Sequence, residues 1–109
     1  MADEKETQEK MAKLQQIEQE LQSFLLQKQN FQNQTIEVDS ALKELESSNE
    51  SYKIIGNIMI RSGKDELVKD LKSKKEMASL RIKTIEKQEN MLREKAGKIQ
   101  SEVMEKLKK

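Results

Sequence analysis

The sequence contains no cysteine, histidine, tryptophan or proline in its 109 residues. Without cysteine it has neither a disulfide framework nor a thiolate nucleophile, and without histidine it lacks an imidazole general base. Aromatic residues make up only 3% of the chain and glycine occurs three times, whereas charged residues make up 38%. This composition is typical of long, solvated helices and argues against a globular domain with a wide apolar core.

Several functional classes are disfavoured by charge and hydropathy. The net charge of +1 argues against a protein that binds nucleic acid by neutralising phosphates. The most basic segment, Lys69–Lys75, is interrupted by Asp70 and Leu71 and carries no aromatic side chain on which a base could stack. No apolar run approaches the roughly 20 residues of a membrane span, and the polar N-terminus does not resemble a secretion signal. We expect a cytoplasmic protein with no nucleic-acid or membrane partner.

Acidic residues are numerous, but catalysis by a carboxylate pair needs a water-excluding pocket that shifts their pKa values. Glu86 and Glu89 share a helix face, where the simpler interpretation is a charged helix surface. Gly56 and Gly63 do not form the glycine-rich pattern of a phosphate-binding loop. We therefore predict that the chain is not an enzyme and has no catalytic, metal or cofactor site.

Apolar residues recur at alternating steps of three and four along two stretches of nearly equal length, which is the pattern of a coiled coil. They predict an N-terminal helix over 5–48 and a C-terminal helix over 64–108, with Ser62 as the N-cap of the second. The seam of the first helix consists of Leu14, Ile17, Leu21, Phe24, Lys28, Phe31, Thr35, Val38, Leu42 and Leu45. The seam of the second consists of Val68, Leu71, Lys75, Ala78, Ile82, Ile85, Glu89, Leu92, Ala96, Ile99 and Val103.

Between the helices, residues 51–61 break the helical period and contain the chain's cluster of β-branched residues. Two apolar runs flank Gly56-Asn57, a pair that can provide the positive φ of a tight hairpin turn. Pairing about this turn places Tyr52 opposite Arg61 and Ile55 opposite Ile58. A lone two-stranded hairpin is only marginally stable, and this one is apolar on both faces. It must therefore pair with other strands, although a plain connector between the helices is the alternative.

Two helices of equal length on either side of a tight turn should fold back as an antiparallel coiled coil. The two seams permit a register that pairs Leu21 with Leu92, and a second register shifted by one heptad. The first is favoured by the turn, and it places an apolar residue opposite each of the polar exceptions Lys28, Lys75 and Glu89. The N-terminal arm is acidic and the C-terminal arm is basic, so the arms attract each other.

Both chain ends meet at the far end of this coiled coil, where the last seam layers are incomplete. Apolar side chains at this tip would remain partly wet, and methionine is a polarisable residue suited to unspecific contacts. An ordinary coiled-coil end is an equally weighted alternative. The candidate tip residues are Met11, Leu14, Val103, Met104 and Leu107.

The sequence resembles β-type subunits of the prefoldin family over almost its whole length. The hairpin Tyr52–Ile60 carries the specific part of the resemblance, together with the helix start Asp65-Glu66-Leu67-Val68. The segments Leu71–Glu76 and Ile82–Glu89 continue it. The single hairpin is similar to the β class, since α-type subunits carry two. Proline is common in the family at the position of Asn57, and its absence here favours an archaeal sequence.

This resemblance implies a single prefoldin-like domain over 1–109, mainly α, whose central hairpin joins an oligomeric β-barrel. It implies an ATP-independent co-chaperone without a cofactor, in which two α-type and four β-type subunits form an α2β4 hexamer. The arm tips would bind non-native polypeptides, prevent their aggregation and deliver them to a group II chaperonin. The residues expected to build the barrel are Tyr52, Ile54, Ile55, Ile58, Met59 and Ile60.

Two other functional classes remain open from the residues alone. One is a structural or adaptor coiled coil that binds partner helices, with an incidental hairpin. The other is a nucleic-acid binder that uses the basic arm, which the near-neutral net charge disfavours.

Overall fold

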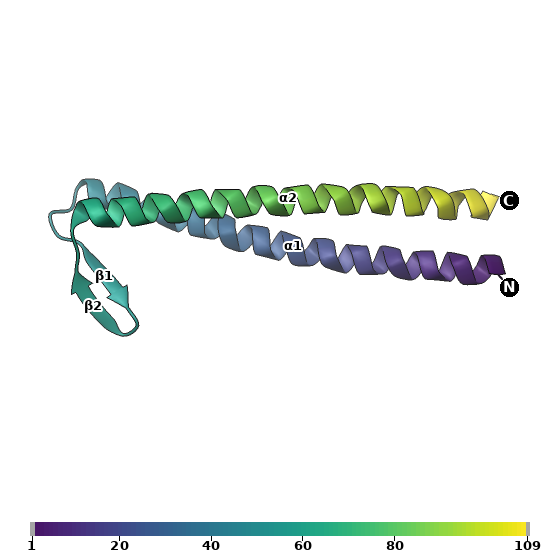
Figure 1. Ribbon diagram of the computed structural model, residues 1–109, viewed down its shortest axis with the longest axis horizontal. Helices are drawn as coiled ribbons and strands as arrows, with labels where there is room; N and C mark the ends of the chain where they lie inside the picture. Colours follow the sequence, from purple (N-terminus) through teal and green to yellow (C-terminus); the bar gives the residue numbers. More distant parts are fainter. Residues whose placement is uncertain (1, 109) are drawn as a thin grey trace. The chain divides into compact units, whose positions relative to one another are not determined.

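Two helices of equal length flank a short β-hairpin in this computed structural model, which describes residues 2–108 (Figure 1). Helix α1 spans Ala2–Glu46, strand β1 Tyr52–Ile55, strand β2 Ile58–Arg61 and helix α2 Lys64–Lys108. The mainly α fold with a central hairpin is as predicted. Helix α1 begins at Ala2 rather than at residue 5 and ends at Glu46 rather than at residue 48, whereas α2 has the predicted bounds.

The end of α1 is determined by serine side chains that compete for backbone hydrogen bonds. The Ser47 amide and hydroxyl both donate to the carbonyl oxygen of Glu44, each over 3.3 Å. The Ser48 amide donates to Leu45 O, also three residues back, so the last turn tightens and the helix stops. Lys64 Nζ then donates to the Glu46 carbonyl over 3.2 Å, which satisfies one of the orphan acceptors at the helix C-terminus.

The predicted N-cap of α2 was wrong by one residue. The carbonyl of Gly63 accepts the first helical hydrogen bond, from the Leu67 amide over 3.1 Å, which makes Gly63 the N-cap. Ser62 is unavailable because its own amide and carbonyl both bond to Ser51, at the base of the hairpin. Asp65 and Glu66 lie in the first turn of α2, where negative charge favours the helix dipole.

The chain forms two compact units, of which one comprises residues 29–82. It contains the hairpin and the adjoining ends of both helices. The buried seam residues here are Val38 and Ala78, with Phe31, Leu42, Leu45 and Leu71 half-buried around them. Lys75 Nζ lies 2.7 Å from Asp39 Oδ1, which places Lys75 beside Val38 as the preferred register requires.

The other compact unit comprises residues 1–28 and 83–109, of which the structure describes 2–28 and 83–108. Ile17, Ile85 and Val103 are its buried apolar residues. Lys10 Nζ lies 3.0 Å from Glu102 Oε2, and Lys106 forms an ion pair with Glu6. These pairs place Lys106 near Thr7, whereas the register shifted by one heptad would place it against Leu14. The antiparallel pairing and the preferred register are thus confirmed in this unit.

One expectation about the seam was wrong. Lys28 and Glu89 were each expected to face an apolar partner, but Lys28 Nζ lies 2.8 Å from Glu89 Oε1. The two charges belong to successive layers, and the length of the lysine side chain lets it reach across one turn. The charged exceptions therefore neutralise each other inside the seam.

Candidate assembly and binding surfaces

The hairpin has the predicted register in every pair. Tyr52 pairs with Arg61, Lys53 with Ile60, Ile54 with Met59 and Ile55 with Ile58. Gly56 has a φ of 60°, and no residue with a side chain has a positive φ within 2–108. A positive φ at the first central position alone is the pattern of a type II′ turn, whose twist matches that of paired strands.

Alternation along the strands gives the hairpin two faces. Ile55, Ile58 and Ile60 share one face with Lys53, while Tyr52, Ile54 and Met59 share the other with Arg61. Every residue of both strands is exposed, and the six apolar side chains retain between 47% and 68% of their accessible surface. An apolar hairpin that is wet on both faces is a surface that further strands or side chains can cover.

The base of the hairpin is held by hydrogen bonds that extend the strand ladder. The Ser62 amide donates to Ser51 O over 2.9 Å, and the Ser51 hydroxyl donates to Ser62 O over 2.6 Å. Ser51 is buried, in contrast to both strands. Lys53 Nζ lies 3.6 Å from Asp70 Oδ2 on α2, and the Tyr52 hydroxyl donates to Glu50 Oε2 over 3.0 Å. The exposed strands thus project from a fixed base within the same compact unit.

The predicted tip residues differ in how much of their surface they present. Met11, Met104 and Leu107 are exposed, and Leu107 retains 72% of its accessible surface. Leu14 is half-buried, whereas Val103 is only 9% exposed because it fills a seam layer. Three of the five side chains are therefore available for contacts, and Val103 is not accessible while the helices remain paired.

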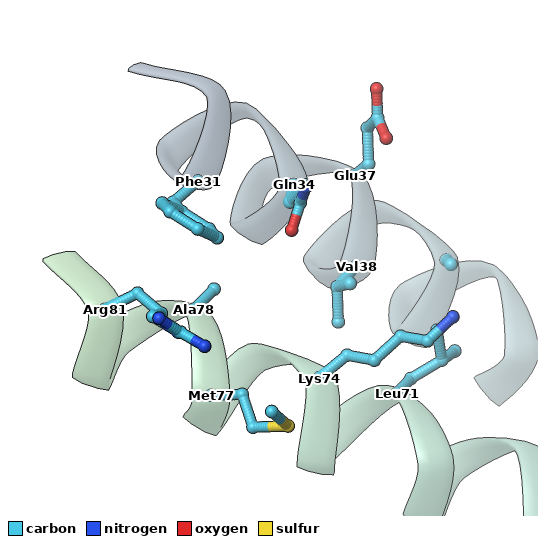
Figure 2. Close-up of a pocket in the computed structure, with 10 residues that line it drawn as sticks. Phe31, Gln34, Glu37, Val38, Leu71, Lys74, Met77, Ala78 and Arg81 are labelled. Atoms are coloured by element: carbon cyan, nitrogen blue, oxygen red, sulfur yellow. The ribbon is translucent and has the colours of Figure 1, made fainter. Parts of the chain in front are cut away.

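Sequence reasoning missed a groove in the unit formed by residues 29–82. It has a volume of about 670 Å³ and lies between α1 and α2 (Figure 2). The heptad pattern identifies which residues lie in the seam, but not where a groove opens beside it. The apolar lining consists of Phe31, Val38, Ala41, Leu71, Met77 and Ala78.

Comparison with known proteins identifies the family. The sequence profile of the family described as "Prefoldin subunit" matches residues 8–109. The chain belongs to the prefoldin subunit family. The prefoldin beta subunit of Saccharolobus islandicus strain L.S.2.15 is 36% identical over 107 residues, which cover 95% of this chain and 85% of the relative. The prefoldin beta subunit of Pyrobaculum calidifontis is 38% identical over 97 residues, covering 86% and 78% of the two chains.

A solved prefoldin structure agrees with the sequence comparison. The prefoldin beta subunit from Thermococcus strain KS-1 matches with a TM-score of 0.87 and 31% sequence identity, over 95% of this chain and 94% of the other. The predicted resemblance to prefoldin β-type subunits is therefore confirmed. Prefoldins are chaperones that assemble as hetero-oligomers of prefoldin subunits, and they do not form an enzyme class.

Further features of this prefoldin chain concern membranes and metals. Neither helix, within residues 2–108, contains a segment that is long and apolar enough to cross a bilayer. The same residues contain no cluster of three or more acidic side chains arranged to hold a metal ion.

Proposed function

We propose that this chain, as one prefoldin-like domain, is the β-type subunit of a cytoplasmic α2β4 prefoldin that holds non-native polypeptides without ATP. Its partners would be α-type subunits and further β-type copies. The observation that carries the assembly part is the hairpin, whose six apolar side chains are exposed on both faces while its base is fixed. Strands of neighbouring subunits would cover both faces in a β-barrel.

The mass of the assembly, measured by light scattering with and without an α-type prefoldin subunit, tests this proposal. We expect a hexamer on mixing, and its loss in the double variant Ile55→Asp, Ile58→Asp, because two facing carboxylates cannot be buried in a barrel. The matched control is Leu26→Asp with Ile36→Asp, which changes two comparably exposed residues on α1. A chain that stays monomeric and ignores the α-type subunit would contradict the proposal and favour an adaptor coiled coil.

Client binding is proposed for the tip, supported by the exposed Met11, Met104 and Leu107. Several weak apolar contacts from separate arms combine by avidity, so tight holding needs no deep pocket and release needs no nucleotide. The two remaining candidates, Leu14 and Val103, would contribute by fixing the seam beneath these side chains.

An aggregation assay on a chemically denatured client tests the tip. Changing Met11, Met104 and Leu107 together to serine should abolish most of the suppression of aggregation while the hexamer still forms. Met91→Ser is the control, because Met91 is equally exposed on α2 but is not one of the tip candidates. Equal suppression by the triple variant and the control would exclude the tip as the client site. Transfer of a labelled client to a group II chaperonin in the absence of ATP tests the delivery step.

A further inference from the structure

The groove between α1 and α2 in the unit of residues 29–82 lies beside a part of the seam with small side chains. The preferred register places Thr35 opposite Ala78, which combines two small side chains in one layer. The Thr35 hydroxyl donates to the Phe31 carbonyl of its own helix over 3.0 Å, so it is committed to α1. Ala41 and Ala78 are the small residues of the groove lining. The resulting volume of about 670 Å³ is within the range of cavities that hold ligands.

The floor of the groove is apolar, and its basic rim lies on α2. Phe31 and Val38 come from α1 and Met77 from α2, and Met77 retains 59% of its accessible surface. Lys74 and Arg81 line the groove one turn to either side of Ala78. Figure 2 shows both side chains extended along α2, beside Leu71 and Ala78.

Charge on the rim is unbalanced. Glu37 is the acidic residue of the lining, and Figure 2 shows its carboxylate directed away from α2. Among the residues that the structure describes, neither Lys74 nor Arg81 forms an ion pair, whereas the adjacent Lys75 is paired with Asp39. An apolar floor with two uncompensated cations is complementary to a segment that carries apolar side chains and flanking carboxylates.

We propose that this groove is a second binding site for non-native polypeptide, selective for apolar segments flanked by acidic residues. This inference rests on the proposed chaperone function and adds a preference for one class of client sequence. A large apolar side chain would pack against Phe31 and Met77, and its acidic neighbours would reach Lys74 and Arg81. The tip, by contrast, offers apolar contacts with no fixed charge requirement.

Fluorescence anisotropy with two labelled peptides tests the groove on the full-length chain. Both peptides share a Leu-Phe-Leu core, flanked by aspartates in one and by lysines in the other. We expect the aspartate peptide to bind the wild type more tightly. In the double variant Lys74→Glu, Arg81→Glu, the affinity for the aspartate peptide should fall about threefold to tenfold, which is the scale of two exposed charge pairs. The preference for that peptide should then be lost. Lys72→Glu with Lys83→Glu is the control, since both lysines are exposed on α2 and lie outside the lining.

Filling the groove provides an independent variant. Ala41→Leu should weaken the aspartate peptide without changing helicity, while Ser73→Leu, at an exposed position of α2 outside the lining, should not weaken it. Equal binding of the two peptides by the wild type would overturn the proposal. A mass of the wild-type chain that rises with its concentration, together with loss of that rise in Ala41→Leu, would also overturn it, because the groove would then bind a second copy of the chain. Preferential, salt-sensitive binding of a labelled RNA oligonucleotide at Lys74 and Arg81 would also overturn it.

The outcome for the groove is separable from the outcome for the chaperone function. If groove variants bind both peptides as the wild type does while the tip variants lose aggregation suppression, the groove proposal fails and the chaperone proposal stands. If the wild-type hexamer does not suppress aggregation at all, the chaperone proposal fails whatever the peptides do.

Discussion

Lys28 and Glu89 form an ion pair within the seam of the coiled coil, with Lys28 Nζ 2.8 Å from Glu89 Oε1. The Glu89 side chain is only 3% exposed, whereas that of Lys28 retains 19% of its surface and can still reach water. Arg93 Nη2 lies 3.9 Å from the other carboxylate oxygen of Glu89, at the periphery. Lys28 thus neutralises the charge of Glu89. A nearly buried carboxylate without a close cation would strongly destabilise the fold.

Replacing Lys28 alone should therefore be costly. Lys28→Met leaves the Glu89 carboxylate nearly buried, and we expect the free energy of unfolding to fall by about 3 kcal/mol. The double variant Lys28→Met, Glu89→Leu should recover most of this loss, since an apolar layer replaces a desolvated ion pair. Urea unfolding followed by circular dichroism, at one fixed chain concentration, measures both. A Lys28→Met chain as stable as the wild type would show that water solvates Glu89 in solution.

The geometry of the hairpin turn predicts that alanine substitutions at two adjacent residues differ in their effect on stability. Gly56 has a φ of 60°, so Gly56→Ala forces an L-residue into a left-handed conformation at a cost of roughly 1–2 kcal/mol. An added Cβ would meet no atom within 4 Å, so the whole effect comes from the backbone. We expect Gly56→Ala to lower the thermal stability of the assembled hexamer, measured by calorimetry.

Asn57→Ala is the matched control, because Asn57 does not have a positive φ. Gly56→Asn should be intermediate, since asparagine tolerates the left-handed region better than alanine does. Equal stability of the two alanine variants would mean that the turn adopts another type once strands of other subunits are added.

Local patterns account for the parts of the fold that the sequence predicts well. The spacing of three and four identifies the residues of both seams, and Gly56-Asn57 between two apolar runs specifies the pairing of Ile55 with Ile58. The features that the sequence pattern did not predict depend on how far a side chain reaches and on how much space remains between the helices. Lys28 crosses a turn to Glu89, and a groove lined by Ala41 and Ala78 lies between the helices. A heptad assigns each position to a face of the helix, but it does not show which contacts a long side chain makes or how much space small side chains leave.

The register predicts which engineered cysteines can form a disulfide. Leu21→Cys with Leu92→Cys places two cysteines in one seam layer, in the register that the pairs Lys10–Glu102 and Glu6–Lys106 indicate for this unit. We expect rapid, near-complete cross-linking under mild oxidation, seen as a faster-migrating band on a non-reducing gel. Leu21→Cys with Ile99→Cys is the control, since these residues meet only if the helices shift by one heptad. Cross-linking of the second pair in preference to the first would contradict the register.

Glu6 and Lys106 form an ion pair between α1 and α2, and its pH dependence can be predicted. The hydrogen bond from Lys106 and its positive charge, together with the more distant charge of Lys10, lower the pKa of the Glu6 carboxyl below its ordinary value. A lowered pKa in the folded state means that folding favours the ionised carboxylate. The pair therefore stabilises the fold above the unfolded-state pKa, and its contribution is lost as the pH falls through the folded-state pKa.

The pKa of Glu6, measured by NMR titration of its side-chain carbonyl, checks this prediction. Lys106→Met should raise the pKa toward the ordinary glutamate value, whereas Lys108→Met, in the same last turn of α2, should change it far less. High salt should reduce the difference between wild type and Lys106→Met, because the exposed pair is open to screening. If Lys106→Met leaves the Glu6 pKa unchanged, the ends of α1 and α2 are not paired at this layer in solution. The apolar tip residues near it would then be more accessible than the structure shows.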